Sequence, residues 1–156
     1  MKQKKLRLFG LLLAAAMLLG CLPVQALAAE GGWFYLAADW NGTLLIAPER
    51  VAYTADQTIF EALNASGHSF GPDENSVTQI DGKTGNFIRS DETGSHDLTR
   101  NAAQAGIRYL CFTDRLTAQP SDAMQSLIAA MADYRLEEPD VQLAAKEAYE
   151  AACAGY

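Results

Sequence analysis

The sequence predicts an α+β fold, in which a small sheet with one short helix is followed by a pair of helices. Two turn signals, Asn41-Gly42 and Asp81-Gly82, lie beside stretches rich in aromatic and β-branched residues and predict β-hairpins. Past residue 120 the apolar residues recur at the three- and four-residue spacing of helices. Strands followed by helices, rather than alternating with them, are typical of the α+β class.

The first 28 residues have the three zones of a cleavable secretory signal peptide. A basic head over residues 2–7 precedes an apolar stretch from Leu8 to Val24, and Ala26-Leu27-Ala28 then places small residues at the two positions that a signal peptidase reads. The apolar stretch, about 17 residues, is at the lower limit for spanning a bilayer, so an uncleaved membrane anchor is the competing interpretation. The Ala-x-Ala site and Pro23 favour cleavage, and we expect no membrane span after it.

A second processing route competes with cleavage after Ala28. The segment Leu18-Leu19-Gly20-Cys21 resembles a bacterial lipobox, whose cysteine is lipidated and becomes the first residue of the mature chain. Leu19 fits the second lipobox position poorly, so we expect cleavage after Ala28 rather than a lipid anchor at Cys21. Both routes predict a protein that is secreted or held at the cell surface.

The chain from Ala29 onward has 128 residues, enough for one domain with a sizeable core. It carries nineteen acidic and eight basic residues, a net charge of −11, because four basic residues precede Ala29. A surface of this charge repels nucleic acid and anionic membranes, so we expect neither as a partner. The partner that we expect is an extracellular protein or a glycan.

The β-rich part is expected to span residues 29–116 and to begin with a hairpin and a capped helix. Three strands are predicted here, Trp33–Ala38, Thr43–Ile46 and Val51–Tyr53. Thr58 and Glu61 have the spacing of a capping box, in which the Thr58 side chain accepts from a backbone amide and Glu61 reaches back to the cap. We expect this helix to end at Gly67 and to be about two turns long. A helix this short is stable only when it packs against other elements.

The rest of this part contains short strands and a polar loop. Three strands are predicted, Val77–Ile80, Asn86–Ser90 and Ile107–Thr113. The turn Asp81-Gly82 makes Asn86–Ser90 the expected partner of Val77–Ile80. In the last strand, alternation places Ile107, Tyr109 and Cys111 on one face, and Leu110 and Phe112 on the other.

Residues 117–156 predict a helical hairpin. The first helix should start with Ser121 as its cap and end before Pro139, and the second should run from Val141 to Cys153. The apolar stripe of the first helix is Met124, Leu127, Ile128, Met131 and Tyr134; that of the second is Val141, Ala144, Ala145, Ala148 and Ala152, with Leu143 and Tyr149 beside it. We expect the pair either to dock on the β-rich part or to begin a region that follows it.

Two segments, Val51–Leu63 and Val77–Gly82, resemble the transcobalamin-like C-terminal domain family of β-grasp domains. The resemblance implies a β-grasp-like sheet and a place among the secreted surface proteins of Gram-positive anaerobes. Where family members usually carry a Trp-Met-Tyr strand, this chain has Gly85–Arg89. The domain that holds most of the cobalamin in transcobalamins is absent, so the resemblance implies no cobalamin and no other cofactor.

The candidate reactive groups do not form a recognisable catalytic or metal-binding motif. Cys111 with His68 or His96 would make a thiol nucleophile with its base, but Cys111 lies within a predicted strand, where a core residue is expected. The acidic loop Asp91–Asp97 has oxygen ligands at alternate positions, but Ala102 stands where a calcium loop needs glutamate. We therefore expect no catalytic, cofactor-binding or metal-binding residues.

Two sets of residues are candidates for other roles. Trp33, Tyr35 and Trp40 form an aromatic cluster that would bind a glycan or a partner surface if exposed, and would otherwise fill the core. Cys111 and Cys153 would pair as a disulfide in an oxidising compartment, or would remain buried free thiols.

We expect a non-enzymatic extracellular module of a bacterial cell-surface or secreted protein, with a role in adhesion, display or spacing. The first alternative is a secreted module that binds a small ligand or a glycan. The second is a cysteine-dependent hydrolase, which would require a histidine within hydrogen-bond reach of Cys111.

Overall fold

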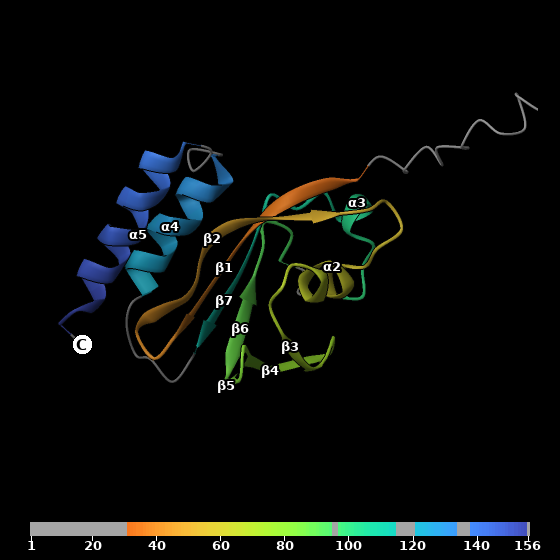
Figure 1. The fold of residues 1–156 in the computed structure, drawn as a ribbon, viewed down its shortest axis with the longest axis horizontal. Coiled ribbons are helices and arrows are strands. Elements are labelled where there is room, and N and C mark those ends of the chain that lie inside the picture. The colour runs from red at the N-terminus through yellow and green to blue at the C-terminus, as the bar shows by residue number, and fades with distance from the viewer. Residues whose placement is uncertain (1–30, 95–96, 115–120, 134–137, 156) are drawn as a thin grey trace, which may run out of the picture.

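The computed structural model describes residues 31–94, 97–114, 121–133 and 138–155. In chain order its elements are β1 (Gly32–Trp40), β2 (Thr43–Tyr53), α2 (Ile59–Ala65), β3 (Phe70–Asp73), β4 (Ser76–Ile80), β5 (Lys83–Thr84), β6 (Phe87–Ser90), α3 (Ala102–Ala105), β7 (Tyr109–Asp114), α4 (Ser121–Ala132) and α5 (Pro139–Cys153). Figure 1 shows α4 and α5 on one side of the larger sheet, and α2, α3 and the smaller sheet on the other. The mixture of two sheets and helices is compatible with the α+β class that the sequence predicts.

The larger sheet has the strand order β2-β1-β7-β6. Strands β1 and β2 pair antiparallel around Asn41-Gly42, whose φ angles of 52° and 78° are those that a two-residue hairpin turn requires. The hairpin predicted at this dipeptide is therefore confirmed. Strand β7 then pairs with β1 in parallel, and β6 pairs with β7 antiparallel, so the last strand lies inside the sheet.

The smaller sheet, β3-β4-β5, contains the second predicted turn. Asp81 and Gly82 both have positive φ and join β4 to β5, which confirms the turn. The predicted partner strand is wrong, because β4 pairs with Lys83–Thr84, whereas Phe87–Ser90 pairs with β7 of the larger sheet. The chain changes sheets at Gly85, where an added Cβ would lie 3.2 Å from the carboxylate of Asp114.

The sheet is covered on both faces, so all residues from Phe34 to Asp39 are buried. Alternation along the strand sends Phe34, Leu36 and Ala38 toward α2 and the smaller sheet, and Tyr35 and Ala37 toward α4 and α5. Strand β7 alternates in the same way, with Leu110 and Phe112 on the first face and Tyr109 and Cys111 on the second, as predicted. The predicted placement of Ile107 with Cys111 is wrong, because Ile107 precedes the strand and packs in the cluster of Leu110 and Phe112. Burial on both faces explains why polar residues do not alternate with apolar residues along β1.

The predicted helices at the end of the chain are present, and they pack on the sheet. In α4 the buried residues are Met124, Leu127 and Met131, and burial of each contributes about 1.5–3 kcal/mol relative to exposure. Ser121 is the first helical residue rather than the cap, and Pro139 begins α5. Tyr134 lies outside the described residues.

The apolar stripe predicted for α5 is not the side of the helix that is buried. Tyr149 and Cys153 are buried against the sheet, whereas Ala144, Ala148 and Ala152 are exposed. Tyr149 buries more apolar area than any alanine, so its position decides the side of the helix that meets the sheet. Among the described residues, no helix is both long enough and apolar enough to cross a membrane.

The capping box predicted at the start of α2 is confirmed by two reciprocal hydrogen bonds. The Glu61 backbone amide donates to Thr58 Oγ1 at 3.1 Å, and the Thr58 amide donates to Glu61 Oε2 at 2.8 Å. The amides of Ile59 and Phe60 donate to the carbonyls of Arg100 and Leu98, so the N-terminus of α2 is also tied to the loop before α3.

Replacing Thr58 with alanine is expected to lower the free energy of unfolding by about 0.5–2 kcal/mol, because the Glu61 amide loses its acceptor. Urea denaturation of the chain from Ala29 onward measures this change. Glu61→Gln is the matched control, since glutamine also accepts from the cap amide. An unchanged midpoint for Thr58→Ala would contradict the role of the cap.

Candidate functional site

The aromatic residues proposed as a binding surface lie on two different faces of the sheet. Tyr35 is 1% exposed and lies beneath α4 and α5, so it is a core residue. Half-buried Trp33 packs on the same side, at 5.2 Å from the Tyr35 ring, with the Arg50 guanidinium 4.1 Å above it. Trp40 packs on the opposite face, and its Nε1–H donates to the Thr84 carbonyl at 3.0 Å. The three residues therefore do not form one shared surface.

Cys111 and Cys153 are both buried free thiols in the cluster between the sheet and the helices. The structure therefore contains no disulfide between them. Burial, with a smaller contribution from the charge of Asp39, raises the pKa of the Cys111 thiol, and burial likewise raises the pKa of Cys153. Because the thiolate is the nucleophile, the raised pKa values and the burial both disfavour reaction of these thiols in the folded chain.

His68 is engaged by two carboxylates. Its Nδ1 lies 2.6 Å from Asp81 Oδ2 and its Nε2 lies 3.1 Å from Glu49 Oε1, so both ring nitrogens are used. The pair of Cys111 with His68 is thus not formed, and His96 lies outside the described residues. Desolvation lowers the pKa of His68, but the hydrogen bonds to Asp81 and Glu49 outweigh it and raise the pKa above 6.5.

The raised pKa of His68 predicts a pH-dependent contribution to stability. The contribution is fully present below pH 6.5, where the ring is protonated in both states, and is lost as the pH rises through the raised pKa. The difference in unfolding free energy between the unchanged sequence and His68→Gln, both beginning at Ala29, is therefore expected to shrink from acidic to alkaline pH. Urea titrations of both proteins measure it, and a difference that grows with pH would contradict the assignment.

The described carboxylates of the acidic loop accept hydrogen bonds from the backbone. Asp91 Oδ1 accepts from the Thr93 amide, Asp97 Oδ1 accepts from the Thr99 amide, and Glu92 Oε1 accepts from the Arg108 amide at 2.6 Å. Within the described ranges, no three histidine, cysteine or acidic side chains come close enough to hold a metal ion. These carboxylates hold the loop and the entry to β7 in place.

Sequence reasoning missed a buried polar group between the sheet and α5. Asp39 is fully buried, and its carboxylate accepts from the Tyr149 hydroxyl at 2.9 Å and from the Asp114 amide at 2.8 Å. Burial raises the pKa of Asp39, and the two hydrogen bonds partly oppose that increase. Asp114 is also buried, and its Oδ1 accepts from the Asn86 amide at 3.2 Å. These contacts fasten α5 and β6 to the central strands.

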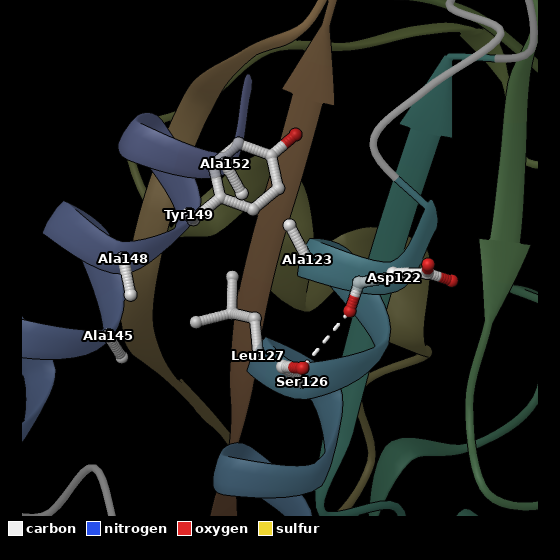
Figure 2. Close-up of a pocket in the computed structure, with 8 residues that line it drawn as sticks. All are labelled: Asp122, Ala123, Ser126, Leu127, Ala145, Ala148, Tyr149 and Ala152. Carbon is white, nitrogen blue, oxygen red and sulfur yellow. Dashed lines mark hydrogen bonds between the residues drawn. The ribbon is translucent and has the colours of Figure 1, made fainter. Parts of the chain in front are cut away.

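A groove of about 340 Å³ lies between α4 and α5. Figure 2 shows the α4 and α5 side chains that line it on its two sides, with the Ser126 hydroxyl bonded to the Asp122 carbonyl. The lining residues are Asp122, Ala123, Ser126, Leu127, Ala145, Ala148, Tyr149 and Ala152. Leu127 and Tyr149 are buried at its floor, whereas Ala148 and Ala152 are exposed. Much of the stripe predicted for the second helix thus lines an open groove.

Comparisons with known proteins returned no match. No family model, no curated protein and no solved structure is significantly similar to this chain. The site is therefore interpreted from its own geometry.

Proposed function

We propose that the chain is a non-enzymatic extracellular module of a bacterial cell-surface or secreted protein, with a role in adhesion, display or spacing. We further propose a β-grasp-like fold for its larger sheet. The strand order β2-β1-β7-β6 supports that fold, since a hairpin is followed by a helix and a later strand pairs in parallel with the first. The helix pair α4 and α5 would then be an addition that covers the free face of the sheet.

The observation that carries the functional proposal is the placement of the reactive side chains. Both thiols and the Asp39 carboxylate lie inside the layer between sheet and helices, and His68 is bonded to two carboxylates on the far side of the sheet. The groove at the surface has a largely apolar lining instead. Buried polar groups of this kind give a fold rigidity, whereas an apolar groove suits a protein partner.

Export is tested with the full chain expressed in a Gram-positive bacterium. We expect the protein outside the cytoplasm, beginning at Ala29 when its N-terminus is sequenced. Cys21→Ala should leave processing unchanged, and Ala28→Tyr should block it, because the peptidase requires a small residue there. A protein that stays in the cytosol and still carries residues 1–28 would overturn the extracellular assignment. If Cys21→Ala blocked processing and Ala28→Tyr did not, the chain would be processed as a lipoprotein instead.

A further inference from the structure

The His68 ring joins the two sheets by bonding to one carboxylate from each. Glu49 belongs to β2 of the larger sheet, and Asp81 begins the turn between β4 and β5 of the smaller sheet. The ring places Nε2 at 3.1 Å from Glu49 Oε1 and Nδ1 at 2.6 Å from Asp81 Oδ2. The His68 side chain is 24% exposed, less than either carboxylate that it contacts. A partly buried ring is thus the polar link between β2 and the turn.

Asp81 is held in place by bonds that do not involve His68. Its Oδ1 accepts from the Ser69 amide at 2.8 Å, and its own amide donates to the Ser69 carbonyl at 2.9 Å. The positive φ angles of Asp81 and Gly82 fix the same residue at the start of the turn. The Asp81 carboxylate therefore stays beside Nδ1 of the ring whether or not the ring is charged.

The contact with Glu49 depends on the charge of the ring. A protonated imidazole has two N–H groups, so it donates to Asp81 and to Glu49 at the same time. A neutral imidazole keeps one proton, and the fixed Asp81 carboxylate holds that proton at Nδ1, since the partner of one nitrogen sets the tautomer. Nε2 then presents a lone pair to Glu49, whose carboxylate is also an acceptor. The hydrogen bond to Glu49 is lost, and this side chain, 40% exposed, is free to turn to water.

We propose that His68 is a pH-operated clamp between the two sheets, which holds Glu49 of β2 while both ring nitrogens carry protons and releases it when Nε2 loses its proton. Among the described residues, the charged groups that act on the ring are Asp81 and Glu49. Desolvation of the ring lowers its pKa, but the hydrogen bonds and charges of these two carboxylates outweigh it, so the clamp should open above pH 6.5. The clamp is a response of the fold to pH and does not depend on the proposed extracellular role.

The first test follows the ring nitrogens of His68 by nuclear magnetic resonance in the chain from Ala29 onward. The protein carries ¹⁵N-labelled histidine and is titrated from acidic to alkaline pH, and His68→Gln identifies the signals of this ring. We expect a transition above pH 6.5 that leaves the proton on Nδ1, the tautomer that a free imidazole side chain disfavours. A transition below pH 6.5, or a neutral ring with its proton on Nε2, would overturn the proposal.

The second test replaces Glu49 with glutamine. The glutamine side chain accepts from a protonated Nε2 and donates to a bare Nε2, so its contact with the ring should survive in both states. The matched control is Glu147→Gln, which removes the same charge from an exposed position of α5. We expect Glu49→Gln to lower the pH of the His68 transition, because the ring loses a neighbouring negative charge, and the control to leave it unchanged.

Amide hydrogen exchange shows whether β2 is released. In the unchanged sequence and in Glu147→Gln, we expect the amides from Glu49 to Tyr53 to lose protection as the pH passes the His68 transition, after correction for the intrinsic exchange rate. In Glu49→Gln their protection should stay constant. Equal His68 transitions in the two variants, or the same loss of protection in both, would show that Glu49 is not the group that the ring releases. Either result leaves the export experiment untouched.

Discussion

Replacing Leu127 with aspartate is expected to release α4 and α5 from the sheet. Leu127 is 2% exposed and packs in the cluster with Tyr35, Met131 and Tyr149. A carboxylate at this position would lose its hydration without gaining a partner, and the effective penalty for a buried ion in a protein is on the order of several kcal/mol. Because the free energy of unfolding of a whole domain is only about 5–15 kcal/mol, the helices should separate or the chain should unfold.

Circular dichroism and hydrogen exchange measure this effect. The matched control is Ala129→Asp, which introduces the same charge at an exposed position of the same helix. We expect the control to retain the native unfolding transition and Leu127→Asp to lose amide protection in both helices. If the amides of α4 and α5 kept their native protection from exchange in Leu127→Asp, these helices would not be anchored by packing on the sheet.

Replacing Tyr149 with phenylalanine is expected to lower the free energy of unfolding by about 1.5–3 kcal/mol, the usual contribution of a hydrogen bond to a charged group. The variant keeps the ring packed but removes the hydroxyl that donates to Asp39 Oδ2 at 2.9 Å. The Asp114 amide then remains as a donor to this carboxylate. Tyr53→Phe is the control, since half-buried Tyr53 packs with the cluster on the other face of the sheet.

The sign of the pH dependence follows from the raised pKa of Asp39. A carboxyl whose folded pKa lies above its ordinary value of 3.8 favours folding when protonated, and this contribution is lost as the pH rises through the folded pKa. The Tyr149 hydrogen bond lowers that pKa, so its removal raises the pKa further. The loss of stability in Tyr149→Phe should therefore be largest at neutral pH and should shrink toward acidic pH; the opposite trend would contradict the buried charge.

Local sequence signals predicted the features that depend on neighbouring residues. The turns at Asn41-Gly42 and Asp81-Gly82 and the capping box at Thr58 are confirmed, because each is decided by backbone preferences within four residues. The alternation from Tyr109 to Phe112 is also confirmed, since side chains in a strand point to opposite faces whatever the strand pairs with. It fails for Ile107, which lies before the strand begins.

Features that depend on distant contacts were not predictable in this way. The partner of β6 is β7 rather than β4, which is settled by how the chain returns to the larger sheet. The hydrogen bond from Tyr149 to Asp39 joins residues 110 positions apart, and no local pattern signals it. The same contact turns α5 so that Ala148 and Ala152 face the groove instead of the sheet.

The candidate site was recovered only in part from sequence. The placement of Cys111 in a strand correctly predicted a core residue, because its neighbours Leu110 and Phe112 are strongly apolar. The three aromatic residues do not share one surface, because Trp33 and Trp40 are seven positions apart and so point to opposite faces of β1. Proximity in sequence within a strand is therefore not proximity on a surface.

The central claim, that the reactive side chains of this chain are structural, is tested most directly by thiol labelling. In the chain from Ala29 onward under native, non-reducing conditions, we expect Cys111 and Cys153 to react with a maleimide far more slowly than a free cysteine does. Both should react fully once the chain is unfolded in urea. Rapid modification of Cys111 in the native chain would contradict the account, because it would reveal an accessible thiolate of the kind that catalysis requires.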